Sequence, residues 1–201
     1  MNLSDISIPD YSGKEHIVFM LLGGNKGHRP SFLREAFFLL ERYIGKAIVV
    51  SSVYETEPWG FDGSEPFFLN QAVVFNTILA PEQVLERALS IELYLGRNRD
   101  LCNNKELRNA KYSSRTIDID ILFYDNIVYE SPELIIPHPR ITERRFVLQP
   151  LCEIMPEASR FLYERNLNRE DFFYGKSFSE LLSECKDTCS VRFYSGSFVN
   201  I

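Results

Sequence analysis

The chain has 201 residues, of which 45% are hydrophobic and 25% charged, and this composition is typical of a folded globular domain rather than a disordered or fibrous chain. Its net charge of −6 argues against broad binding to nucleic acid or to an anionic membrane surface. Because no apolar run approaches the roughly 18 residues of a membrane span and the N-terminus lacks a signal-peptide pattern, we expect a cytoplasmic protein with reduced cysteines.

The first part of the chain alternates between strand and helix patterns. Residues 16–25 form an apolar run that contains two glycines near its end, which indicates a central strand followed by a turn. A helix is predicted over residues 29–45, where Pro30 suits the first turn. The β-branched stretch at residues 47–60 predicts a strand that runs into a loop, and residues 67–77 predict its antiparallel neighbour.

The second part of the chain repeats this alternation. Residues 81–96 have the apolar spacing of a helix that begins at a proline and ends at a glycine. A long basic loop is predicted over residues 97–114, and a strand over residues 115–124. After a turn, residues 127–129 read as a short partner strand.

The resulting order is β-α-β-β-α-β, an α+β arrangement in which two helices cover one face of an antiparallel sheet and leave the other face free. A further helix is expected from Thr142, and the capping-box pattern that starts at Ser177 predicts another in the tail. We therefore expect a polar lead-in at residues 1–15, one domain at residues 16–160, and a C-terminal extension at residues 161–201 that packs on the same domain.

Two carboxylates interrupt the last predicted strand. Successive side chains of a strand point to opposite faces, so Asp118 and Asp120 share one face, about 7 Å apart along the strand, while the isoleucines between and beside them face the helices. Like charges so close raise each other's pKa unless a cation neutralises them, and carboxylates combined with water and phosphate suit Mg²⁺. A solvated strand edge with two charges remains the alternative.

Basic residues flank this pair in the sequence. The guanidinium fork of arginine matches phosphate oxygens and keeps its charge, so a cluster of arginines opposite metal-binding carboxylates predicts a triphosphate site. Each arginine taken alone also fits an ordinary surface charge. The basic residues on either side are Arg97, Arg99, Lys111, Arg115, His138, Arg140, Arg144 and Arg145.

A second group of residues suits a flat heteroaromatic ring. By strand alternation Phe68 and Asn70 share a face, which places an aromatic surface for stacking beside a carboxamide for paired hydrogen bonds. Thr56, Trp59 and Phe146 are candidates to complete such a pocket. Each of the aromatic residues, considered alone, also fits a place in the hydrophobic core.

Six segments of the chain together resemble the 6-hydroxymethyl-7,8-dihydropterin pyrophosphokinases of folate biosynthesis. They are LGGN, SSVYETEPWG, FLNQAV, IELYLGRNR, RTIDIDILFY and PHPRITERRFVLQPLCEI, in this order over residues 17–156. The combination of the aspartate strand with the PHPR turn is the most specific part of the resemblance.

The resemblance implies transfer of a pyrophosphoryl group from ATP to the pterin hydroxymethyl oxygen with release of AMP, on a ferredoxin-like sheet. It implies two Mg²⁺ ions held by Asp118 and Asp120, with Arg97 and Arg115 assisting catalysis. The pterin pocket that it implies consists of Thr56, Pro58, Trp59, Phe68, Asn70 and Phe146. The ATP site that it implies consists of Glu92, Arg99, Tyr112, Arg115, Ile121, His138, Pro139 and Arg144. The basic loop at residues 97–114 is expected to close over the substrates.

Two other functions share some of these features. An RNA-binding module uses the same element order, but it needs an aromatic, basic central strand where this chain has Asp118 and Asp120. A nucleotide-sugar transferase also uses paired aspartates, but it leaves the PHPR turn unexplained. We expect a monofunctional monomer that binds small molecules and neither nucleic acid nor membrane, and expect Cys185 and Cys189 to be inert.

Overall fold

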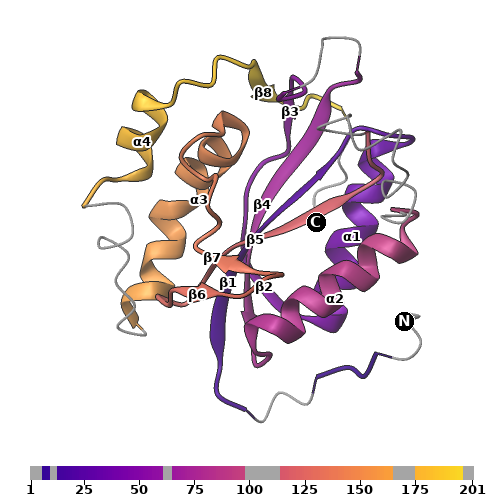
Figure 1. The fold of residues 1–201 in the computed structure, drawn as a ribbon, viewed down its shortest axis with the longest axis vertical. Helices are drawn as coiled ribbons and strands as arrows, with labels where there is room; N and C mark the ends of the chain where they lie inside the picture. The colour runs from indigo at the N-terminus through magenta and orange to yellow at the C-terminus, as the bar shows by residue number, and fades with distance from the viewer. Residues whose placement is uncertain (1–5, 10–12, 61–64, 98–113, 165–174, 197–201) are drawn as a thin grey trace.

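The computed structural model describes residues 6–9, 13–60, 65–97, 114–164 and 175–196. The elements are β1 (His16–Gly24), α1 (Arg29–Tyr43), β2 (Gly45–Val50), β3 (Tyr54–Thr56), β4 (Phe68–Thr77), α2 (Pro81–Tyr94), β5 (Asp118–Tyr124), β6 (Tyr129–Glu130), β7 (Ile135–Ile136), α3 (Arg145–Glu164), α4 (Phe178–Glu184) and β8 (Val191–Phe193). The chain is therefore a mixed α and β protein with an antiparallel sheet, as the sequence predicts (Figure 1).

The main sheet has the strand order β5-β1-β4-β3-β8, and β2 pairs with β4 beside β3. All of its pairings are antiparallel. β1 lies between β5 and β4, and residues 17–24 of it are buried because both of its edges are paired and both of its faces are covered over most of their length. The single strand expected at residues 47–60 is wrong in detail, because residues 51–53 separate β2 from β3.

One face of the sheet packs against α1 and α2. Pro30 and Pro81 lie in the first turns of these helices, as predicted, where the missing proline N–H leaves no bond unmade. The prediction that the isoleucines flanking the aspartates face the helices is confirmed, because Ile117, Ile119 and Ile121 belong to the core formed on this face.

The opposite face is largely covered by α3 and α4, so the expectation of a free face is wrong (Figure 1). α3 places a row of apolar residues at helical spacing on this face: Val147, Leu148, Leu151, Ile154, Ala158 and Leu162. They pack against Ile17, Phe19 and Leu21 of β1. α3 begins at Arg145, near one end of the sheet.

The chain after α3 returns to the sheet. The capping box predicted at Ser177 is present, since its hydroxyl accepts a hydrogen bond from the N–H of Glu180 and the Glu180 side chain accepts one from the N–H of Ser177. β8 then adds an edge strand to β3, which the sequence did not indicate. The short strand expected at residues 127–129 is displaced, because β6 begins at Tyr129 and pairs with β7 instead of with β5.

Candidate active site

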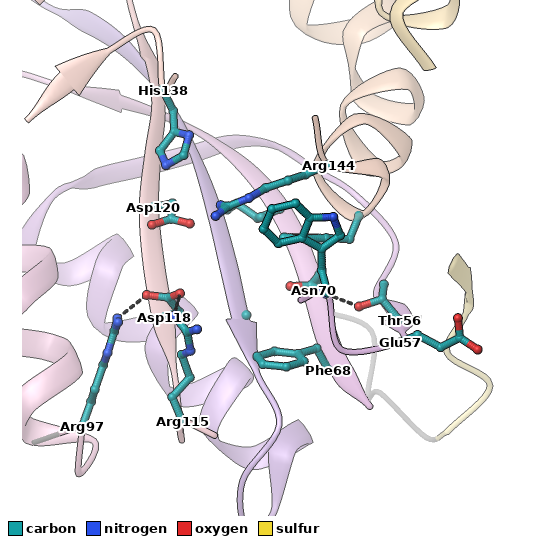
Figure 2. Close-up of a pocket in the computed structure, with 14 residues that line it drawn as sticks. Thr56, Glu57, Phe68, Asn70, Arg97, Arg115, Asp118, Asp120, His138 and Arg144 are labelled. Carbon is teal, nitrogen blue, oxygen red and sulfur yellow. Dashed lines mark hydrogen bonds and ion pairs between the residues drawn. The ribbon is translucent and has the colours of Figure 1, made fainter. Parts of the chain in front are cut away.

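A cavity of about 230 Å³ opens between β1, β4 and β5 on one side and the start of α3 on the other (Figure 2). It lies on the sheet face that carries the aspartates. The residues that line it are Leu21, Gly23, Thr56, Glu57, Trp59, Phe68, Asn70, Arg97, Arg115, Asp118, Asp120, His138, Arg144 and Phe146.

The strand register brings together two half-sites: the predicted phosphate site around the aspartates, and the predicted ring-binding site around Asn70. Gly23 of β1 pairs with Asn70 of β4 on one side and with Asp118 of β5 on the other. A Cβ atom at Gly23 would lie 2.5 Å from Oδ1 of Asn70, so only glycine leaves room for this carboxamide. The three strands thus form a floor with an amide at one side and a carboxylate at the other.

On the carboxylate side, Asp118 lies between two arginines. Its Oδ1 accepts a hydrogen bond from Arg97 and its Oδ2 accepts one from Arg115. Glu92 is 1% exposed behind this group, and its Oε1 accepts hydrogen bonds from the N–H of Ile119 at 2.8 Å and from Arg97. Glu92 therefore fixes both the strand and one arginine from outside the cavity.

Asp120 lies on the same face, one strand repeat beyond Asp118. Burial and the neighbouring Asp118 carboxylate raise the pKa of Asp120 to about 7, although Arg144 and Arg115 act in the opposite direction. A bound cation would relieve this repulsion, and two carboxylates suit Mg²⁺. Within the described ranges no cluster of three or more histidine, cysteine or acidic side chains is arranged for a metal, so water and phosphate oxygens would complete the coordination.

Two arginines that line the cavity have hydrogen-bond donors without an acceptor in the described part of the chain. The Nε atoms of Arg115 and Arg144 are buried without a hydrogen-bond partner among the described residues. The guanidinium group of Arg144 lies over the rings of Trp59 and Phe146, at 5.2 and 5.6 Å from their centroids, and that of Arg115 lies 5.8 Å from the ring of Phe68. Buried N–H groups without acceptors are suited to an anionic ligand.

His138 faces the cavity as a neutral donor. Its backbone N–H donates to the carbonyl oxygen of Leu122 at 2.9 Å, and its Nδ1 accepts from the N–H of Arg140 at 3.2 Å. The proton of the neutral ring is then assigned to Nε2. Burial, followed by the charges of Arg144 and Arg140, lowers the pKa of His138 to about 4, so the ring is uncharged at neutral pH.

The other side of the cavity combines an amide, a hydroxyl and three aromatic rings. Nδ2 of Asn70 donates to Oγ1 of Thr56 at 2.8 Å, and both side chains are almost fully buried. Figure 2 shows this pair beside Phe68, across the cavity from the aspartates. Such a wall can hold a planar ring by stacking and fix its orientation by hydrogen bonds to its edge.

Most of the residues proposed from the sequence meet in this cavity. Among the described residues, those that do not line it are Pro58, Glu92, Ile121, Pro139, Arg140 and Arg145. Ile121 is 3% exposed, and its side chain lies in the core on the α1 and α2 face, on the side of the strand away from the cavity. Arg99, Tyr112 and most of the basic loop lie outside the described residues.

Three lining residues were not proposed from the sequence. Leu21 and Gly23 are two residues apart on β1, so alternation along this strand would have placed both on the cavity face had its pairing with β5 been known. Glu57 follows β3, and nothing in its sequence context distinguishes it from a surface charge.

The comparisons with known proteins agree with this geometry. The family model for 7,8-dihydro-6-hydroxymethylpterin-pyrophosphokinase (HPPK) matches residues 19–156. The chain belongs to this family. Two HPPK relatives are named 2-amino-4-hydroxy-6-hydroxymethyldihydropteridine pyrophosphokinase. The one from Bacillus subtilis is 39% identical over 146 residues, covering 72% of this chain and 81% of its own. The one from Porphyromonas gingivalis is 40% identical over 143 residues, covering 70% of this chain and 91% of its own.

A solved HPPK-DHPS structure in complex with substrates is similar in fold, with a TM-score of 0.60 at 17% identity. The match covers 85% of this chain but 43% of that one. HPPK membership confirms the resemblance and makes the chain a pyrophosphokinase, an enzyme of the transferase class. This membership favours the enzyme over the RNA-binding module considered as an alternative. In the described part of the chain, no helix has both the length and the apolar character to span a membrane.

Proposed function

We propose that this chain transfers the pyrophosphoryl group of ATP to the hydroxymethyl oxygen of 6-hydroxymethyl-7,8-dihydropterin and releases AMP, as a step of folate biosynthesis. The observation that carries the proposal is the pairing of two half-sites across one glycine. Asp118 and Asp120 on β5 face the Thr56 and Asn70 pair on β3 and β4, within a single cavity. The names of the relatives, which give a hydroxymethyldihydropteridine and a pyrophosphokinase activity, support the pterin as the acceptor.

The β5 side of the cavity suits the triphosphate. Asp118 and Asp120 would hold two Mg²⁺ ions, which would neutralise charge on the phosphate oxygens when bound. Arg115 and Arg144 supply the free Nε donors, and His138 supplies a neutral N–H. We assign Arg97 and Arg115 to catalysis and Glu92 to the positioning of Arg97. The other ATP-site residues inferred from the family, Arg99, Tyr112, Ile121 and Pro139, remain part of this proposal.

The β4 side suits the pterin. Asn70 and Thr56 provide hydrogen-bonding groups for the edge of the heterocycle, and Phe68 and Phe146 provide the stacking faces. Arg115 lies over the ring of Phe68 and Arg144 over that of Phe146, so both guanidinium groups border the proposed pterin pocket. Pro58 and Trp59 complete the pocket in our assignment.

The chemistry that follows is an in-line displacement. The hydroxymethyl oxygen forms a bond to the β-phosphorus of ATP, the bond between that phosphorus and the oxygen bridging to the α-phosphorus breaks, and AMP leaves with the bridging oxygen. The hydroxyl proton passes to water. Because the transition state of such transfers is loose, positioning and charge stabilisation by Arg97, Arg115 and Arg144 are the main contributions of the protein.

We also propose the finer organisation of the chain. The order β5-β1-β4-β3 with α1 and α2 on one face supports a ferredoxin-like pyrophosphokinase domain at residues 16–160. The contacts of α4 with α3 and of β8 with β3 support an extension at residues 161–201 that packs on the same domain. We assign a monomeric, cytoplasmic enzyme.

The test is AMP production from ATP, Mg²⁺ and the pterin. We expect AMP release that depends on pterin and falls at least about a hundredfold in Asp118→Ala and Asp120→Ala, because each removes a charge opposite the phosphates. Glu133→Ala, at an exposed acidic residue away from the cavity, is the matched control and keeps full activity. Pterin-independent AMP release, or two fully active aspartate variants, would contradict the assignment.

A further inference from the structure

Residues 186–194, which we call the C-terminal strap, lie beyond the part of the chain that the HPPK family model matches. Their β8 strand lies beside β3 at the edge of the sheet (Figure 1). In this pairing Val191 is opposite Thr56 and Phe193 is opposite Tyr54. The rings of Phe193 and Tyr54 stack at 4.9 Å between centroids. The strap is therefore bound to the strand that presents Thr56 to the cavity.

The strap also fixes the loop directly after β3. The N–H of Glu57 donates to the carbonyl oxygen of Ser190 at 3.1 Å, and the N–H of Ser190 donates to Oε2 of Glu57 at 2.8 Å. Since Glu57 lines the cavity, this reciprocal pair sets the direction of a cavity side chain. Arg192 adds an ion pair of 2.7 Å to Glu55 and lies 5.5 Å from the ring of Phe67, the residue before Phe68.

A separate contact reaches the opposite wall. Oδ2 of Asp187 accepts a hydrogen bond of 2.9 Å from the N–H of Arg145, in the first turn of α3, where backbone N–H groups lack partners within the helix. Its Oδ1 accepts one of 2.9 Å from the N–H of Cys189, which holds the strap itself in shape. The neighbours of Arg145 are Arg144 and Phe146, both of which line the cavity.

We propose that the C-terminal strap is a positioning element of the pterin site, which holds the two walls of the pocket at a set separation. This inference rests on the proposed function. The strap joins the end of β3 to the start of α3 through backbone groups next to Thr56, Glu57, Arg144 and Phe146. These elements form the aromatic and amide side of the cavity, whereas Asp118 and Asp120 lie on β5, which the strap does not pair with. Loss of a strap contact should therefore weaken pterin binding more than nucleotide binding.

The fluorescence of Trp59, the single tryptophan of the chain, provides a binding readout that does not require catalysis. In the full chain with Mg²⁺, we expect Asp187→Ala to raise the Kd of the pterin about tenfold, the effect of one lost hydrogen bond to a charged group. The Kd of a non-hydrolysable ATP analogue should rise by a smaller factor, through Arg144 next to the contact. Asp187→Asn keeps one acceptor oxygen and recovers part of the affinity. Arg192→Ala, at an exposed side chain that folding tolerates, shifts the pterin Kd in the same direction by a smaller factor.

Two control variants separate this role from a general effect on stability. Glu184→Ala breaks the exposed pair with Lys176 just before the strap, and Arg160→Ala removes an exposed charge from α3; both retain the wild-type Kd values. An equal rise in the Kd values of pterin and nucleotide in Asp187→Ala, together with a lower Tm, would overturn the positioning role. An unchanged pterin Kd in both Asp187→Ala and Arg192→Ala would also overturn it. No response of wild-type Trp59 fluorescence or activity to the pterin would instead overturn the proposed function itself.

Discussion

At the scale of single residues, Asp118 and Asp120 illustrate a conflict between function and stability. Asp118 is compensated by Arg97 and Arg115, whereas Asp120 keeps a raised pKa because burial and Asp118 both oppose its charge. The folded protein therefore binds a proton at Asp120 more tightly than the unfolded chain does. Stability from this group is complete below pH 3.8 and is lost as the pH rises through about 7.

The first prediction follows from the raised pKa of Asp120, which makes its charged form destabilising. In the absence of metal, Asp120→Asn should raise Tm at pH 8 by about 2 to 4 °C, the shift expected from roughly 1 kcal/mol in a chain of this size, because it removes the repulsion. At pH 4 the difference should be small, since the wild-type carboxyl is then protonated in the folded state. Thermal melts in EDTA at both pH values measure it.

Mg²⁺ with an ATP analogue serves as the control for this prediction. The ligands should stabilise the wild type more than Asp120→Asn and so reduce the advantage of the variant. A variant that is less stable than the wild type at pH 8 without metal would show that Asp120 is not under electrostatic strain.

The candidate site could be predicted from the sequence where its residues follow strand alternation. Asp118 and Asp120, like Phe68 and Asn70, share a face for a local geometric reason, and the structure places both pairs at the cavity. Ile121 was assigned by family position, but alternation turns its side chain into the core. Glu57 lines the cavity and contacts Ser190, 133 residues away, and no local pattern encodes this contact.

At the scale of secondary structure, the register of three strands decides whether the two half-sites meet. The backbone of β1 separates Asn70 from Asp118 at Gly23, and the missing side chain there leaves the floor of the cavity flat. The Cβ position at Gly23 is blocked by Oδ1 of Asn70. The carboxamide can therefore keep its bond to Thr56 only while residue 23 is glycine.

The second prediction concerns this position. Gly23→Ala should raise the KM for the pterin about tenfold or more and leave the KM for ATP much less affected, because Asn70 must move away from Thr56. Steady-state kinetics with each substrate varied in turn measures the two constants. Gly13→Ala, where an added Cβ meets Ile78 at an ordinary 3.4 Å, is the matched control. Equal KM values for Gly23→Ala and wild type would show that the carboxamide does not orient the pterin.

Local signals explain which elements could be predicted. The helices α1, α2 and α4 have start signals in or just before their first turn, at Pro30, Pro81 and Ser177, and all three were placed correctly. β8 has three residues and is a strand only because β3 offers it an edge. The interruption between β2 and β3 likewise depends on Ser51, whose hydroxyl accepts a hydrogen bond from the N–H of Ala72 across the sheet. Such pairings are long-range in sequence and have no local signature.

At the scale of the whole molecule, the sheet is enclosed between two helical layers, and the cavity remains where the second layer ends. The apolar spacing of α3 indicates that the helix is packed, but it does not say against which surface. The sequence order alone therefore predicted a free face, whereas the chain uses α3 to bury much of it and to present Arg144 and Phe146 at the edge of the cavity.

The third prediction tests whether this second layer belongs to the same folding unit. Leu148 is fully buried between α3 and the sheet, so Leu148→Ala should lower the free energy of unfolding by about 2 to 5 kcal/mol through lost burial and a residual cavity. Urea denaturation followed by circular dichroism measures the change, which should appear as one cooperative transition. A loss below about 1 kcal/mol, or a separate early transition for α3, would contradict the three-layer description.

The most direct test of the central claim is the identity of the nucleotide product. Phosphorus-31 NMR of the purified enzyme with ATP, Mg²⁺ and 6-hydroxymethyl-7,8-dihydropterin should show AMP and a pyrophosphate ester of the pterin appearing in equal amounts, with no ADP. That result would establish transfer of the β- and γ-phosphoryl groups as one unit to the hydroxymethyl oxygen. Formation of ADP with a pterin monophosphate, or hydrolysis of ATP without any pterin ester, would contradict the pyrophosphokinase account.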